Sequence, residues 1–145
     1  MRQTEHVFDP ATGIITTDEG WVLGPDSTLS QARSTWPTAS LRDVRTGWWW
    51  LGVSRVTLGG TAFSPDLGFH GEALRMMFLV LTMDDDGRGW DAWTYEHEQE
   101  RDRRQVAWLE QTIGVAQADP PWGYYGSSYD PKGGFSSIVV RYGPL

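Results

Sequence analysis

Short apolar runs that end at proline or glycine occupy most of this sequence, and this pattern is typical of an antiparallel sheet. We expect strands at residues 6–8, 13–16, 20–23, 41–44, 48–58 and 74–83. Residues 62–69 are interrupted by Pro65, which cannot donate a hydrogen bond to a neighbouring strand. We therefore predict that residues 62–69 form an edge strand or a loop.

Two of these segments carry more specific information. Residues 41–44 and 48–58 are expected to pair across the turn at residues 45–47, and the apolar alternation of the second strand slips by one near Gly52. Such a slip predicts a β-bulge at that point. The continuous apolar run at residues 76–81 suits a strand that is covered on both faces. Periodicity alone also allows a buried helix there, and we favour the strand.

Two helices are expected. Asp26 or Ser27 can cap a short helix that ends before Pro37. A longer helix is predicted from about residues 92–94 to residue 113, with Gly114 as its C-cap. The charged residues between 96 and 104 are expected to face solvent. The side expected to pack on the sheet carries Val106, Trp108, Leu109 and Ile113.

The last segment is expected to form a β-hairpin around residues 129–134, where Gly133 and Gly134 permit a tight turn. The predicted fold class is therefore α+β, with residues 1–145 as a single domain. A twisted antiparallel sheet is packed by one long helix, with one short N-terminal helix and a C-terminal β-hairpin. No cysteine is present, so packing alone must hold the fold, and 19 aromatic residues supply large side chains for it.

The charge of the chain narrows the classes of partner. Twelve basic and 19 acidic residues give a net charge of −7, which repels the phosphates of nucleic acids and attracts a basic protein. We therefore expect no nucleic-acid partner. The N-terminal residues carry no apolar signal segment, and no apolar run reaches the length of a membrane span. These features predict a cytoplasmic protein without a membrane partner, and they leave the oligomeric state open.

No arrangement of residues typical of catalysis stands out. The three histidines, His6, His70 and His97, are far apart in sequence, and neither an HExxH pair nor a GxSxG turn is present. The acidic run at residues 84–86 precedes a glycine, but its spacing differs from that of a calcium-binding EF-hand loop, which favours a solvated turn. We expect neither an enzyme nor a bound metal or organic cofactor.

The last third of the chain carries a recurring combination of residues. It comprises Glu96, Glu100, Arg103, Arg104, Trp108, Leu109, Ile113, Gly114, Trp122, Gly123, Ser128, Tyr129, Asp130, Lys132, Gly133, Gly134, Ser137, Ile138, Arg141 and Tyr142. This segment resembles the closing part of small bacterial immunity proteins found beside polymorphic or contact-dependent toxins. That family usually has a histidine shortly before the Trp–Leu pair, where this chain has Gln105. The difference argues against chemistry at this position.

The resemblance implies that the chain neutralises a cognate toxin by forming a tight protein complex. Candidate contacts are exposed aromatic and charged residues, namely Trp49, Asp84, Asp85, Asp86, Glu98 and Arg101. Strand alternation requires Trp49 to point away from Trp48 and Trp50, so it is either exposed or packed beneath the long helix. A carbohydrate-binding module that uses exposed Trp and Tyr rings is the alternative hypothesis.

Overall fold

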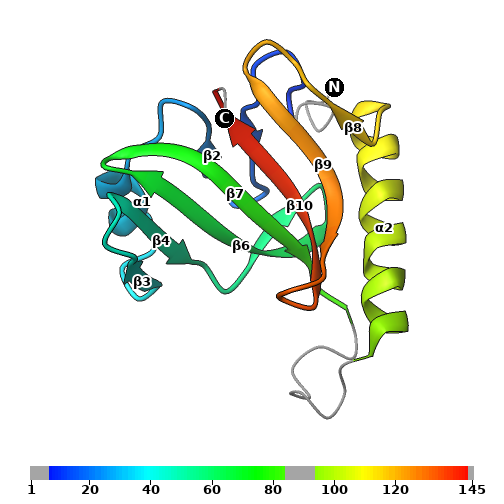
Figure 1. Ribbon diagram of the computed structural model, residues 1–145. Coiled ribbons are helices and arrows are strands. Elements are labelled where there is room, and N and C mark those ends of the chain that lie inside the picture. The colour runs from blue at the N-terminus through cyan, green and yellow to red at the C-terminus, as the bar shows by residue number, and fades with distance from the viewer. Residues whose placement is uncertain (1–6, 84–93, 144–145) are drawn as a thin grey trace.

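The computed structural model describes residues 7–83 and 94–143, and these residues form a large antiparallel sheet with two helices (Figure 1). The predicted α+β class is confirmed. The helices are α1 (Leu29–Thr35) and α2 (Tyr95–Ile113). The strands are β1 (Ile15–Thr16), β2 (Val22–Leu23), β3 (Ser40–Asp43), β4 (Trp48–Gly52), β5 (Val56–Leu58), β6 (Thr61–His70), β7 (Ala73–Leu81), β8 (Gln117–Ala118), β9 (Gly123–Asp130) and β10 (Phe135–Tyr142).

The large sheet has the strand order β3-β4-β6-β7-β10-β9-β8, and β5 pairs with β6 on the same side as β4. Strands β1 and β2 form a separate small antiparallel pair. The chain passes from the long β6–β7 hairpin through α2 to the β9–β10 hairpin, and β10 then pairs with β7. The C-terminal hairpin therefore extends the sheet from β7 towards the edge strand β8.

Strands β4 and β5 are two parts of one strand that is broken by a bulge. Gly52 pairs with Asp66 and Val56 pairs with Phe63, so residues 53–55 lie opposite only residues 64 and 65. One extra residue on the β4–β5 side is the defining feature of a bulge. The slip in alternation near Gly52 was therefore a correct signal.

The same bulge explains why the prediction for residues 62–69 was wrong. Strand β6 is hydrogen-bonded on both sides, with Pro65 in its interior. The carbonyl oxygen of Pro65 accepts from the amide of Val53 at 2.9 Å, so the main-chain edge of Pro65 faces the bulged strand. Its missing N–H therefore lies where the ladder is already interrupted, and a central proline is tolerated.

The short helix starts slightly later than predicted. Thr28, rather than Asp26 or Ser27, is the N-cap of α1, and its side chain accepts from the amide of Gln31 at 3.1 Å. The side chain of Gln31 accepts from the amide of Thr28 at 3.0 Å, which completes a reciprocal capping box. Ser27 caps nothing in α1, and its hydroxyl accepts from the amide of Gly24 instead.

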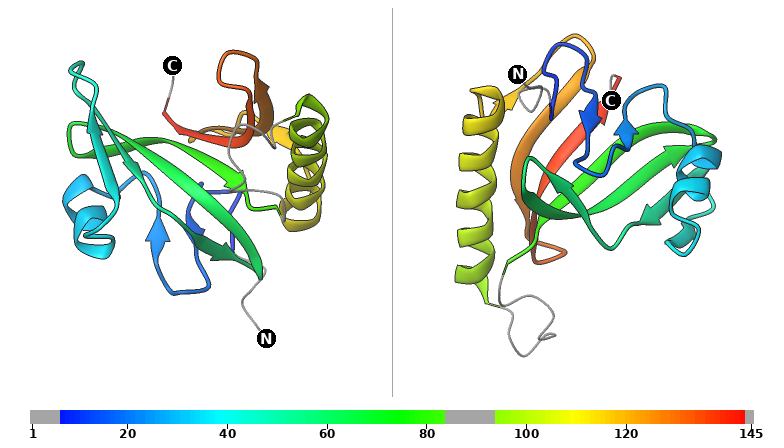
Figure 2. Two further views of the ribbon diagram at one scale, coloured as in Figure 1. Left: turned by 90° about the horizontal axis from the view of Figure 1, so that it is seen from below. Right: turned by 180° about the vertical axis from the view of Figure 1, so that it is seen from behind.

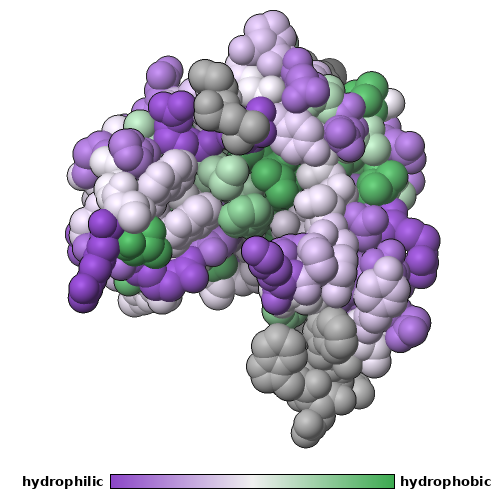
Figure 3. Space-filling view, in the orientation of Figure 1, coloured by the Kyte–Doolittle hydropathy of each residue, from purple (hydrophilic) through white to green (hydrophobic). Residues whose placement is uncertain are grey.

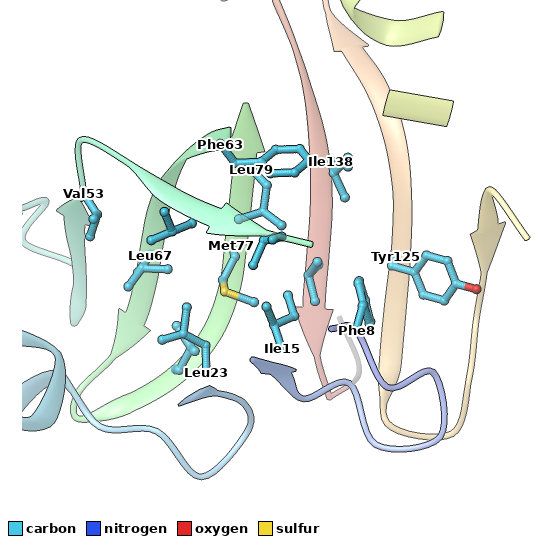
Figure 4. Packing of buried hydrophobic residues seen from close by; sticks show 14 of the residues in the cluster. Phe8, Ile15, Leu23, Val53, Phe63, Leu67, Met77, Leu79, Tyr125 and Ile138 are labelled. Carbon is cyan, nitrogen blue, oxygen red and sulfur yellow. The ribbon is translucent and has the colours of Figure 1, made fainter. Parts of the chain in front are cut away.

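The two faces of the sheet have different surroundings. One face, the core face, carries the buried residues of β6, β7 and β10, and β1, β2 and α1 cover it (Figure 2). Figure 4 shows the side chains of Phe8, Ile15 and Leu23 on the same side of the sheet as those of Met77 and Leu79, and all five belong to the buried cluster. The opposite face of β7 is half-buried rather than fully covered, so the expectation that β7 is enclosed on both faces was wrong.

The Trp122–Gly123 pair at the start of β9 makes the contacts that join the N-terminal and C-terminal parts of the chain. The indole N–H of Trp122 donates to the carbonyl of Pro10 at 2.8 Å, and its ring lies over Gly13. A Cβ at Gly123 would lie 1.8 Å from the carbonyl oxygen of Arg141, so only glycine fits there. These residues therefore have a structural role, which is to hold the N-terminal turn against the β9–β10 hairpin.

Tyr142 makes a third contact of this kind and gives a pH-dependent prediction. Its buried hydroxyl donates to the carbonyl of Gly13 at 2.7 Å, and burial raises the pKa of this hydroxyl well above its usual range. Above about pH 10 an unfolded tyrosine loses its proton while folded Tyr142 keeps it, so the free energy of unfolding falls as the pH rises. Tyr142→Phe should remove part of this alkaline fall and lower the free energy of unfolding at pH 7 by about 1–2 kcal/mol.

Urea unfolding of the wild type and of Tyr142→Phe at pH 7, 10 and 11 measures both effects. Tyr95→Phe is the matched control, because Tyr95 is 52% exposed. Equal pH dependence of the wild type and Tyr142→Phe would contradict the assignment.

Candidate functional site

The strongest candidate site is the face of the large sheet opposite the core face. We call it the open face and define it by half-buried side chains that alternate with core residues along β4, β7, β10 and β9. Its members are Trp48, Trp50, Met76, Phe78, Val80, Val139, Arg141 and Tyr124. Figure 3 looks onto this face and shows apolar side chains gathered near its centre, over β7 and β10.

A stack of aromatic rings forms one half of the open face. The rings of Trp48 and Trp50 lie 6.0 Å apart at an interplanar angle of 15°. Trp50 in turn stacks on Phe78 at 5.4 Å and 18°. Trp50 pairs with Gly68 of the neighbouring strand β6, and a Cβ at Gly68 would lie 2.6 Å from the Trp50 ring. Gly68 therefore allows the indole to lie low on the sheet and holds the stack in place.

An arginine lies on the other half of the open face. Arg141 pairs with Met76 on one side and Tyr124 on the other, and its guanidinium carbon lies 5.2 Å from the centre of the Tyr124 ring. This distance is typical of a cation–π contact. Beside the aromatic stack, Arg42 and Asp66 form an ion pair at 2.6 Å, with Arg42 paired to Trp50 and Asp66 paired to Phe78. The open face thus combines tryptophan, tyrosine and arginine, which are the residues that dominate protein-binding hot spots.

Both helices leave the open face uncovered. Leu29 and Ala32 of α1 pack into the core cluster. The side chains of Gln105 and Glu98 on α2 hydrogen-bond to the hydroxyl of Ser127 and the amide of Ser136. Ser127 pairs with the buried core residue Ile138, so α2 lies on the core face. The sheet also curves, so that the β3–β4 and β9–β10 hairpins rise on the same side of β6 and β7 (Figure 2, left).

Trp49 is on the core side of the sheet. It pairs with Phe69, which is fully buried, and packs against the hydrophobic core while remaining partly exposed. Of the two alternatives that strand alternation left open, core packing of Trp49 is correct, but Trp49 is not beneath the long helix, because α2 lies at the opposite end of the sheet from β4 (Figure 1). Its neighbours Trp48 and Trp50 are the tryptophans of this strand that belong to the open face.

The expectation that Glu98 and Arg101 contact a partner at the surface was wrong. Their side chains are 1% and 3% exposed and form an ion pair at 3.0 Å between α2 and the sheet. Glu98 also accepts from the amide of Ser136 at 3.0 Å, and Arg101 donates to the carbonyl of Leu81. The candidate contacts Asp84, Asp85 and Asp86 lie outside the described residues.

The buried pair belongs to a larger polar cluster that sequence reasoning missed. Gln105 is fully buried, accepts from the amide of Leu81 at 3.0 Å and donates to the hydroxyl of Ser127 at 3.0 Å. The pairing of β7 with β10 ends at Leu79 and Ile138. Beyond these residues, side chains of α2 accept hydrogen bonds from the main-chain amides of both strands, at Leu81 and Ser136. The signal was the spacing of residues 98, 101, 105 and 109, which places them on one side of a helix.

The described part of the chain offers few features for catalysis or for binding a metal. A cavity of about 70 Å³ lies between β2 and α1, next to the edge-to-face pair of Trp21 and Trp36, and no ionisable side chain lines it. Within residues 7–83 and 94–143, no group of three or more His, Cys, Asp or Glu side chains is arranged to hold a metal. Neither described helix has the length and apolar character needed to cross a membrane.

Comparison with known proteins does not assign the chain to a family. No family model matches it, and no curated protein or solved structure shows significant similarity. The open face is therefore interpreted from its own geometry.

Proposed function

We propose that this chain is an immunity-type binding protein that neutralises a cognate bacterial toxin by forming a tight complex through the open face. The observation that carries the proposal is a sheet face that neither described helix covers, with stacked Trp48, Trp50 and Phe78 at one half and Arg141 on Tyr124 at the other. The resemblance of the last third to immunity proteins supports the toxin as the class of partner. In this proposal the protein acts by binding and has no catalytic step.

The energetics of such a face suit protein binding. Half-buried aromatic and aliphatic side chains still expose apolar area, and covering that area is favourable by roughly 25 cal/mol per Å². A stable complex covers about 800 Å² on each partner, with the binding energy concentrated in a few central aromatic and arginine residues. The open face spans several strands, and β-sheet hydrogen bonds fix its residues before binding. Little conformational entropy is then lost on association.

Carbohydrate binding is less well supported by the same geometry. A sugar stacks on the exposed flat side of an aromatic ring, but Trp50 is stacked between Trp48 and Phe78 at interplanar angles of 15° and 18°. Tyr124 is likewise covered on one side by Arg141. These rings contact each other rather than offering free platforms, which favours a protein partner.

Affinity capture followed by a growth test examines the proposed function. The tagged chain is used to capture proteins from the native host at two salt concentrations, and mass spectrometry identifies what is retained. We expect one toxin-domain protein in roughly stoichiometric amount. Expression of that protein alone should then arrest the growth of a test strain, and co-expression of this chain should restore it. The proposal would be contradicted if co-expression left the toxicity of the captured protein unchanged. It would also be contradicted if repeated capture from cells that make the toxin retained none of it.

A further inference from the structure

Arg141 is an unusual charge for its position. It lies among apolar and aromatic side chains, with Met76 and Tyr124 as its cross-strand neighbours and Val139 beside it on β10. Its Nε donates to the carbonyl of Gly143 at 3.4 Å, which is a long contact. The guanidinium is held in place over the Tyr124 ring and remains partly exposed.

No carboxylate in the described residues is paired with Arg141. The ion pairs formed there join Arg42 to Asp66, Arg101 to Glu98, and both Arg103 and Arg104 to Glu100. Asp66, the acidic residue of the central strands on this face, is already engaged through both of its carboxylate oxygens by Arg42. Asp130, at the tip of the β9–β10 hairpin, accepts from the amide of Lys132. Within residues 7–83 and 94–143, Arg141 is thus a cation without an acidic partner in an apolar setting, in a chain of net charge −7.

This arrangement has a consequence for any partner that covers the open face. Removing a guanidinium from water is unfavourable unless a carboxylate replaces the lost hydration. Arginine offers a planar pair of N–H donors that matches a carboxylate in two parallel hydrogen bonds. A partner that buries Met76, Phe78 and Val139 must therefore bring an acidic group to Arg141, or the complex is weakened by an unpaired buried charge.

We propose that Arg141 is the specificity-determining residue of the open face and binds an acidic side chain flanked by apolar residues of the protein partner. The inference rests on the proposed function for the class of partner. The net charge of −7 attracts a basic protein as a whole, while the local match at Arg141 selects an acidic residue within the contact. A second copy of this chain is a poorer occupant, because Asp66 of that copy is already bound by its own Arg42.

A displayed library of random 12-residue peptides provides a test that needs no knowledge of the toxin. Peptides are selected on the immobilised full-length wild-type protein alone, without counter-selection against any variant. We expect the enriched peptides to carry Asp or Glu next to aromatic or aliphatic residues. The dissociation constant of one enriched peptide is then measured for the wild type, Arg141→Gln, Arg141→Lys and the control Arg103→Gln, whose arginine lies exposed on α2.

The expected result is a loss of at least about 10-fold for Arg141→Gln, partial retention for Arg141→Lys and no change for Arg103→Gln. Replacing the acidic residue of the peptide with its amide should cause a similar loss, with little further loss when both changes are combined. Enrichment without acidic residues, equal binding by Arg141→Gln, or no enrichment would each overturn the inference. Acidic peptide binding without any captured toxin would reject the proposed function alone.

Discussion

Replacing Arg101 with methionine is expected to lower the free energy of unfolding by about 3–5 kcal/mol. The ion pair with Glu98 is almost fully buried, so the change leaves a carboxylate without its cation inside the protein. It also removes the donor to the carbonyl of Leu81 at the end of β7. Urea unfolding followed by tryptophan fluorescence and circular dichroism measures the loss.

Two further variants separate burial from charge. Arg103→Met removes an ion pair with Glu100 on the same helix, but this pair is exposed, and its loss should cost less than about 1 kcal/mol. Adding Glu98→Gln to Arg101→Met should recover more than about 1 kcal/mol, because the neutral amide can still accept from Ser136. Similar losses for Arg101→Met and Arg103→Met would show that the buried cluster does not hold α2 on the sheet.

The second large effect concerns binding by the open face. Val139→Asp is expected to weaken the complex with the captured toxin by about 100-fold or more, which corresponds to about 2.7 kcal/mol. The new carboxylate lies beside Phe78, with which Val139 pairs, and must lose its hydration when the partner covers the face. It also offers Arg141 an acidic neighbour that competes with the partner's own acidic group.

Val22→Asp is the matched control. Val22 is also a strand valine, is 59% exposed, and belongs to the small β1–β2 pair on the other side of the sheet. Its replacement should leave the affinity within about twofold of the wild type. Isothermal titration or surface plasmon resonance gives both dissociation constants, and unfolding curves verify that each variant is folded. Equal losses for the two variants would place the contact elsewhere.

Strand alternation accounts for what could be predicted from the sequence. The alternation of residues 48–58 indicated the strand, its hairpin with residues 41–44 and the bulge that follows Gly52. It also required Trp49 and Trp50 to lie on opposite faces. Alternation shows only that Trp49 and Trp50 lie on opposite faces, however, so it could not decide which of these two side chains faces the core. That choice depends on where β1, β2 and α1 pack, which is a property of the whole fold.

The remaining errors arose where tertiary contacts override local rules. Pro65 indicates an edge strand by itself, and only the bulge opposite it allows a central position. Glu98 and Arg101 were expected at the surface because charged side chains are rarely buried. They are buried because they satisfy each other and the main chain of two strands that separate at this end of the sheet. No single segment of the sequence carries that information.

Hydroxyl-radical footprinting of the captured complex tests the central claim most directly. Met76, Trp48 and Trp50 are reactive side chains on the open face, whereas Trp21 and Trp36 lie beside α1 on the other side of the sheet. The proposed binding mode predicts that the complex protects the first three residues from oxidation several-fold and leaves the last two unchanged. Unchanged oxidation of Met76, Trp48 and Trp50 in a saturated complex would show that the open face does not bind the toxin.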